Sequence, residues 1–227
     1  MKILLIIFSL TSFLFAKVHI VQEDFIVEKP INSWIEIKNK NLTRQKYDYS
    51  CGSASLSTIL KYYYNLDIGE KDILNSILEA KGINKNKLEE LEEEDFSLSF
   101  LDLANYSYQK GFKAIGLALD FESLSKLKAP VILYVKIRKN EHFTIYKNID
   151  EHYVYLADPS FGNIKVSIEK FKEMFYQRED LNYPGKLLAI VPVTNEQKQK
   201  INTSFMKVEE NSNFVYDSIL DQMLPRK

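Results

Sequence analysis

Cys51 is the residue of this sequence whose position favours chemistry most clearly. It is the only cysteine in the chain, and it lies where a polar loop meets a helix predicted from the helical spacing of Leu56 and the apolar residues after it. A thiolate at a helix N-terminus is stabilised by unpaired backbone N–H groups and by the helix dipole. Gly52, which lacks a Cβ, is expected to let a substrate backbone approach. Cys51 is therefore a candidate nucleophile for acyl transfer through a thioester.

His142 is the predicted partner of the thiol. Residues 142–158 alternate apolar and polar side chains, which predicts a β-hairpin with its turn centred on Asp150 and with His142 directly opposite Asp158. Directly opposed residues have Cβ atoms about 4.5 to 5.5 Å apart, so a carboxylate can hydrogen-bond to the imidazole. We expect His142 to act as general base and acid and Asp158 to orient it and stabilise its charged form.

Gln45, upstream of Cys51, completes the candidate site. Its side-chain amide and the backbone N–H of Cys51 are expected to stabilise an oxyanion, and losing one such donor costs about 2.7 to 4 kcal/mol of barrier. Each residue alone has an ordinary structural explanation, but the order Gln, Cys, His, Asp favours catalysis. We expect no metal or other cofactor, since one cysteine and no closely spaced histidine pair supply too few zinc ligands.

The elements that must position these residues are helices first and strands second. Apolar spacing predicts helices at about 56–64, 70–80, 98–108, 124–127 and 168–175. It predicts strands at 112–119, 131–137, 142–148, 153–158, 164–166 and 187–193. This order predicts an α+β domain in which N-terminal helices pack on an antiparallel β-sheet, because alternating β-α-β units are absent from the pattern.

The N-terminus has the composition of an export signal. Lys2 is followed by an apolar stretch that ends at Ala16, shorter than the about 20 residues that a membrane-spanning helix requires. We therefore expect residues 1–16 to be a signal peptide and the protein to be periplasmic or secreted. Leu14 occupies a position where a small residue is preferred for cleavage, so an uncleaved signal that anchors the protein to the membrane is the alternative.

Three further parts are expected after the signal. Residues 17–40 form an N-terminal extension with two short strands, the second at Trp34–Ile37. Residues 41–194 form the main domain, in which the charged run 84–95 is a solvated segment. Residues 195–227 are polar with isolated apolar side chains, which indicates a loosely docked tail. The chain carries 30 Lys and Arg against 31 Asp and Glu, scattered along its length, so no nucleic-acid partner is expected.

The segments around the candidate site resemble the bacteriocin-processing cysteine peptidases. These are papain-like domains at the N-terminus of peptide-exporting ABC transporters, and they cut leader peptides after a double glycine. The resemblance rests on QKYDYSCGSASLSTIL, which begins at Gln45, and on residues 97–119 and 129–175. It implies a papain-like cysteine peptidase fold for residues 41–194, with the nucleophile, base, orienting carboxylate and oxyanion donor at the positions derived above.

The sequence departs from that family in three respects. It shows no transporter membrane domain or nucleotide-binding domain, it carries an export signal, and Phe175-Tyr176 stands where the family commonly has a tryptophan. We expect an exported cysteine endopeptidase that cleaves a peptide or protein partner, with small residues such as Gly-Gly at the cut and a secretion system as a second partner. Two alternatives stay open, an acyl transferase of the transglutaminase type and a peptide-binding module that does not cleave.

Overall fold

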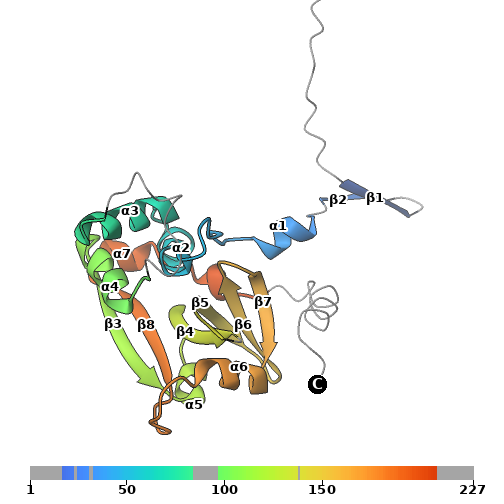
Figure 1. Cartoon of the computed structure of the whole chain (residues 1–227). Helices are drawn as coiled ribbons and strands as arrows, with labels where there is room; N and C mark the ends of the chain where they lie inside the picture. Colours follow the sequence, from blue (N-terminus) through green and yellow to red (C-terminus); the bar gives the residue numbers. More distant parts are fainter. Residues whose placement is uncertain (1–16, 23–24, 31–32, 84–96, 138, 209–227) are drawn as a thin grey trace, which may run out of the picture. The chain divides into compact units, whose positions relative to one another are not determined.

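The computed structural model describes residues 17–22, 25–30, 33–83, 97–137 and 139–208 (Figure 1). The chain divides into two compact units, Met1–Ile37 and Lys38–Lys227. The predicted signal peptide and the charged run 84–95 lie outside the described residues. In the described part of the chain, no helix combines the length and the apolar character that crossing a membrane requires.

The first unit contains an antiparallel pair of strands, β1 (Lys17–Gln22) and β2 (Phe25–Pro30). The strand predicted at Trp34–Ile37 is wrong, because this segment begins the short helix α1 (Trp34–Lys38). Ser33 and Glu36 form a capping pair at its start. The Ser33 N–H donates to the Glu36 carboxylate at 2.6 Å, and the Glu36 N–H donates to the Ser33 hydroxyl at 3.3 Å. Such reciprocal bonds satisfy the free N–H groups of a first helical turn and favour a helix over a strand.

The second unit is built on an antiparallel sheet with the strand order β3-β8-β4-β5-β6-β7 (Figure 1). Its strands are β3 (Phe112–Leu119), β4 (Val131–Ile137), β5 (Asn140–Ile149), β6 (Tyr153–Asp158), β7 (Gly162–Ser167) and β8 (Gly185–Pro192). All of them occur where the alternation of apolar side chains predicted a strand, because one face of each strand is turned towards a core.

Helices cover both faces of this sheet. One face carries α2 (Cys51–Thr58), the π-helical turn η1 (Ile59–Tyr63), α3 (Glu70–Ala80) and α4 (Phe100–Gln109). The other face carries α5 (Phe121–Ser125) and α6 (Ile168–Phe175). Each face has its own apolar core, so the adjacent β5 residues Ile145 and Tyr146 lie in different cores. The predicted α+β architecture is confirmed.

The segment expected to form a tail contributes to the first core. It contains α7 (Asn195–Gln199) and the 3-10 turn η3 (Thr203–Met206). Phe205 is 1% exposed and packs in the core that also contains Tyr63. The Asn202 N–H donates to the Tyr63 carbonyl at 2.7 Å, which ties this segment to the end of η1. Residues 209–227 lie outside the described part of the chain.

Candidate active site

Cys51 is the first residue of α2 and is half-buried. Ser50, directly before it, is fully buried, and its hydroxyl lies 2.5 Å from the carboxylate of Glu70. Glu70 is the buried first residue of α3, and it also accepts the Lys46 N–H at 2.9 Å. A buried carboxylate therefore holds both ends of the loop that leads into the nucleophile helix. Sequence reasoning missed Glu70, since its position in an amphipathic helix gives no signal of this contact.

Gly52 has a different role from the one predicted. A Cβ at this position would lie 3.1 Å from the Phe143 ring and 3.3 Å from the Leu98 side chain. The missing Cβ therefore allows α2 to pack closely against these two apolar side chains, and it does not provide room for a substrate.

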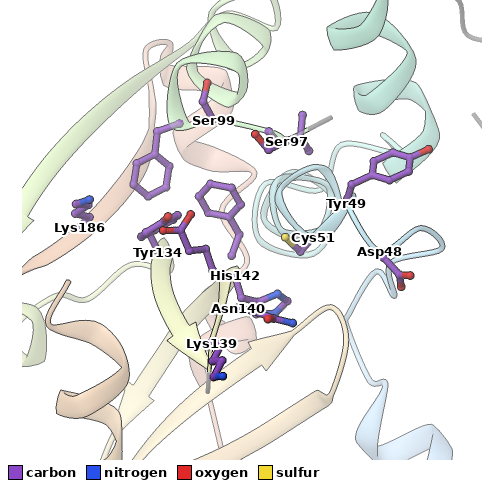
Figure 2. A pocket seen from close by; sticks show the side chains of 14 residues that line it. Asp48, Tyr49, Cys51, Ser97, Ser99, Tyr134, Lys139, Asn140, His142 and Lys186 are labelled. Atoms are coloured by element: carbon purple, nitrogen blue, oxygen red, sulfur yellow. The ribbon is translucent and has the colours of Figure 1, made fainter. Parts of the chain in front are cut away.

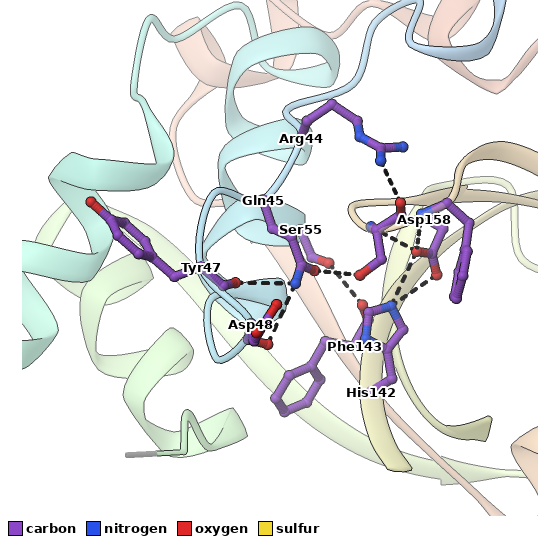
Figure 3. A network of polar contacts seen from close by, with 10 residues as sticks. Arg44, Gln45, Tyr47, Asp48, Ser55, His142, Phe143 and Asp158 are labelled. Atoms are coloured by element: carbon purple, nitrogen blue, oxygen red, sulfur yellow. Dashed lines mark hydrogen bonds and ion pairs between the residues drawn. The ribbon is translucent and has the colours of Figure 1, made fainter. Parts of the chain in front are cut away.

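His142 and Asp158 are joined by a short ion pair (Figure 3). The His142 Nε2 lies 3.0 Å from Oδ2 and 3.1 Å from Oδ1 of Asp158. The side chain of Asp158 is fully buried, and that of His142 is 11% exposed. Asp158 Oδ1 also accepts the backbone N–H groups of Ser160 at 2.8 Å and Phe161 at 2.9 Å. These donors fix the carboxylate, so the orientation of the imidazole is determined by the backbone turn after β6.

The predicted register of the β5–β6 hairpin is wrong, although the predicted shared face is right. Tyr146 lies opposite Leu156, and continuing this register places Thr144, not His142, opposite Asp158. His142 is therefore the diagonal neighbour of Asp158 on the same face of the sheet. Diagonal positions are farther apart than opposed ones, at about 7 to 8 Å, and the length of the imidazole spans the difference.

Two local features cause this change of register. The turn lies beyond Asp150, whose N–H donates to the Tyr153 carbonyl at 3.0 Å and whose carboxylate accepts the Tyr153 N–H at 2.7 Å. Near the turn Asn148 lies opposite Tyr155, and the register then shifts so that Lys147 is an extra residue in β5. Such a bulge gives no periodic signal, so the sequence alone placed the turn and the pairing incorrectly.

The imidazole of His142 lines the same pocket as the thiol of Cys51. Burial lowers the pKa of His142, but hydrogen bonds to Asp158 and Cys51 and the charges of both groups outweigh burial and raise this pKa to about 10. Burial raises the pKa of Asp158, yet the hydrogen bond and charge of His142 and the Phe161 N–H hold it below its ordinary value. Since Nε2 faces the carboxylate, Nδ1 is the ring atom left for the thiol.

Gln45 lies in the loop before α2 and is tied to the turn that follows Asp158 (Figure 3). Its Oε1 accepts the Ser160 hydroxyl at 2.6 Å, and its Nε2 donates to the carbonyls of Tyr47 at 3.1 Å and Asp48 at 3.4 Å. The structure therefore joins His142 to Asp158 and places Cys51 and His142 in one pocket. It links Gln45 to them through the loop and the turn.

Cys51 and His142 line a pocket of about 680 Å³ (Figure 2). Three aromatic rings, those of Phe100, Tyr134 and Phe143, form one wall with ring centroids 5.1 to 6.3 Å apart. The Lys186 ammonium lies 5.1 Å from the Tyr134 ring. The pocket thus combines an apolar wall with polar groups beside the thiol. These residues come from the start of α4 and from the strands β4, β5 and β8, and nothing in their local sequence predicted that they converge.

Two further points from the sequence bear on the site, the residue at the tryptophan position and the side chains that could bind a metal. Phe175, at the position where a tryptophan was expected from the resemblance, is fully buried in the core formed with α6. Over the described ranges, no group of three or more His, Cys, Asp or Glu side chains could hold a metal ion.

A thiol at a helix start, an imidazole and a buried carboxylate on an adjoining antiparallel sheet define the papain-like cysteine peptidase class of scaffold. The chain belongs to the peptidase C39 family, whose sequence profile matches residues 39–178. The family and fold expected from the resemblance are therefore confirmed, and the expected class of cysteine-type peptidase is confirmed at the level of the family.

Several known proteins are similar to this chain. The probable functional amyloid protease FapD of Pseudomonas fluorescens is 33% identical over 146 residues, which cover 64% of this chain and 62% of FapD. FapD of Pseudomonas aeruginosa is 30% identical with the same coverage. The match thus spans less than two thirds of the length of these relatives. The peptidase domain of Streptococcus ComA, a bi-functional ABC transporter, shares the fold with a TM-score of 0.50 at 18% identity, covering 67% of this chain and 98% of that domain.

Proposed function

We propose that this protein is a cysteine endopeptidase that cleaves a peptide or protein through a thioester on Cys51. The observation that carries the proposal is the position of His142, whose ring is bonded to the buried carboxylate of Asp158 and lines the same pocket as the thiol of Cys51. Membership of the peptidase C39 family and the similarity to FapD support the same reaction class.

In the proposed reaction, the Cys51 thiolate attacks the carbonyl carbon of the scissile bond and forms a C–S bond. His142 gives its proton to the leaving amine as the C–N bond breaks, and it then takes a proton from the water that hydrolyses the thioester. Asp158 keeps its charge throughout and stabilises the protonated imidazole. The products are a free amine and a carboxylate, and the thiolate–imidazolium pair is restored.

The proposed oxyanion donor is Gln45, together with the backbone N–H of Cys51. One amide hydrogen of Gln45 is engaged by the Tyr47 carbonyl at 3.1 Å, while the bond to the Asp48 carbonyl is longer, at 3.4 Å. Hydrogen bonds of that length are weak, so the second N–H can exchange this carbonyl for a developing oxyanion as its hydrogen-bond acceptor at little cost, and it keeps its proton. Losing this donor costs about 2.7 to 4 kcal/mol of activation free energy.

The proposed substrate is an exported polypeptide, cut next to small residues. The aromatic wall of Phe100, Tyr134 and Phe143 supports binding of apolar side chains beside the thiol. The similarity to relatives named probable functional amyloid proteases supports a functional amyloid protein as the substrate. The proposal that the enzyme itself is exported rests on the composition of residues 1–16. This segment is either a signal peptide that is cleaved or an uncleaved signal that anchors the protein to the membrane.

Mass spectrometry of candidate exported polypeptides, incubated with wild-type protein or with Cys51→Ala, tests this proposal. Defined fragments with wild-type protein, and none with the variant, are the expected result. Added primary amines separate hydrolysis from transfer, because an acyl transferase would convert the fragments to amides. Binding of a polypeptide by wild-type protein without any cleavage would contradict the peptidase and favour a binding module.

A further inference from the structure

Ser160 contacts both the proposed oxyanion donor and the carboxylate that orients the imidazole. Its hydroxyl donates to Gln45 Oε1 at 2.6 Å, and its backbone N–H donates to Asp158 Oδ1 at 2.8 Å. The residue is half-buried in the turn between β6 and β7. Ser160 therefore joins Gln45 and Asp158, which come from distant parts of the chain. Figure 3 shows the side chains of Gln45 and Asp158.

Two further hydrogen bonds hold the same two segments together. The Gln45 N–H donates to the Pro159 carbonyl at 3.2 Å, and the Arg44 guanidinium donates to the Ser160 carbonyl. The backbone path of the turn is thus fixed without the Ser160 hydroxyl. The hydroxyl has a narrower effect, since its hydrogen-bond partner in the described part of the chain is the oxygen of the Gln45 amide.

Hydrogen bonds on both sides hold the Gln45 amide in one orientation, with Oε1 towards the Ser160 hydroxyl and Nε2 towards the carbonyls of Tyr47 and Asp48. An amide has an acceptor end and a donor end of nearly the same shape, so a rotation about the last side-chain bond exchanges them. A hydroxyl that donates to Oε1 holds the oxygen on the Ser160 side and leaves the two Nε2 hydrogens on the other side. The reversed amide would present its oxygen to a developing oxyanion and would destabilise the negative charge.

We propose that Ser160 is a positioning residue that sets the Gln45 amide with its donor end towards the oxyanion. The proposal rests on the proposed function, because it assigns a role to Gln45 in the same reaction. It separates two roles within one residue. The backbone N–H fixes Asp158, and the side chain fixes Gln45, so a substitution of the side chain affects only the second role.

A double-mutant cycle tests this assignment. The probe is a peptide p-nitroanilide that ends in Gly-Gly, measured with wild-type protein, Ser160→Ala, Ser160→Thr, Gln45→Ala and the double variant Ser160→Ala/Gln45→Ala. We expect Ser160→Ala to lower kcat about tenfold with KM unchanged, and Gln45→Ala to lower it about 100-fold. In the Gln45→Ala background, Ser160→Ala should change kcat less than about twofold. Ser160→Thr, which keeps the hydroxyl, should retain kcat within about twofold of wild type.

A matched control is Ser125→Ala, which removes an exposed hydroxyl that donates to the Glu122 carbonyl at 2.7 Å in α5. This variant should leave kcat and KM unchanged. An equal loss of kcat from Ser160→Ala in the wild-type and Gln45→Ala backgrounds would overturn the proposal. So would a slower alkylation of Cys51 in Ser160→Ala, because it would show an effect on the thiol and imidazole.

A measurement without substrate keeps this inference separate from the proposed function. The two Nε2 hydrogens of Gln45, assigned in an ¹H–¹⁵N spectrum by their loss in Gln45→Ala, should be well dispersed in wild-type protein. In Ser160→Ala they should move towards the shifts of a free amide, and in Ser160→Thr they should not. Unchanged shifts in Ser160→Ala would overturn the assignment even if the protein cleaves peptides. Failure of wild-type protein to cleave any peptide would contradict the function and leave this spectral test to decide the contact.

Discussion

The site depends on the protonation state of one residue, the imidazole of His142. Burial alone would make a neutral His142 more stable, but the charges of Asp158 and the thiol reverse this and raise its pKa to about 10. A group with a raised pKa stabilises the folded state fully below its ordinary value of 6.5, and this stabilisation is lost as the pH rises towards about 10. The imidazolium is thus both a catalytic group in the proposed reaction and a stabilising charge.

Asp158→Asn should shift the pH dependence of cleavage. The change removes the negative charge that raises the pKa of His142, so this pKa falls and the protonated imidazole is lost at lower pH. We expect the alkaline limb of kcat/KM to move down by more than about one pH unit. A pH–rate profile with a peptide substrate measures this shift.

The control for that profile is Asp67→Asn, which removes an exposed carboxylate paired with Lys61. It should leave the profile unchanged. An alkaline limb at the same pH in wild type and Asp158→Asn would show that Asp158 does not set the charge of the imidazole.

The four candidate residues were predictable because reaction chemistry restricts residue type and order. The groups that hold them were not. Glu70 and Ser160 act through hydrogen bonds to loop atoms, and such bonds depend on the path of the backbone between elements. Residue types as common as Glu and Ser give no signal of these contacts.

Among the elements, the bulge at Lys147 decides which face of β5 carries the imidazole. Near the turn the register would place Ile145 opposite Asp158 if it continued unchanged, and His142 would then lie on the other face. The extra residue restores the shared face, because a shift of one residue moves every side chain of a strand to the opposite side. The pairing of His142 with Asp158 therefore depends on Lys147 staying outside the ladder of paired residues.

Deletion of Lys147 should remove the bulge and keep the pairing of His142 with Asp158. Tyr146 lies opposite Leu156 and Asn148 opposite Tyr155, so removing the residue between them leaves both pairs in place. His142 then stays on the face of Asp158, and Ile145 and Phe143 stay in the first core. We expect kcat/KM to stay within about tenfold of wild type, measured with a peptide substrate.

The matched control is Lys147→Ala, which keeps the bulge and removes only the side chain, including its contact with the Phe205 ring at 4.9 Å. This variant should keep kcat/KM within about threefold, since an exposed cation–π contact contributes about 0.5 to 1 kcal/mol. A loss of kcat/KM of about 1000-fold in the deletion variant, with Lys147→Ala unaffected, would contradict this description of the bulge.

Helices and strands with a clear periodic spacing of apolar residues were predicted well. Elements whose conformation depends on single contacts were not. All strands of the main sheet follow from alternation, and α3 and α4 follow from helical spacing with glycines at positive φ, Gly82 and Gly111, after their ends. The helix α1 was missed because a capping pair, Ser33 and Glu36, outweighs a short apolar alternation.

Across the whole second unit, two cores share one sheet, and the nucleophile helix belongs to the first. That core is completed by Phe205, far along the chain in η3, which packs against Tyr63 at the end of η1 with ring centroids 6.2 Å apart. A stable position for α2 thus depends on a segment whose polar composition predicted a loose tail. Composition failed here because one buried aromatic side chain is enough to fix a short segment.

Phe205→Ala should lower the free energy of unfolding by about 3 to 5 kcal/mol, through lost apolar burial and the cavity left in the first core. Urea unfolding measures this loss. Leu181→Ala is the control, because Leu181 is 87% exposed, and it should change the free energy of unfolding by less than about 0.5 kcal/mol. Equal stability of the two variants would show that η3 does not complete the core.

The central claim is that the thiol and the imidazole act as one charged pair, and the rate of Cys51 alkylation tests it most directly. The chain has no other cysteine, so iodoacetamide uptake, followed by intact mass at neutral pH, reports on this thiol alone. We predict that wild-type protein reacts at least about tenfold faster than His142→Ala, since the imidazolium favours the thiolate. Equal rates in the two proteins would contradict the account.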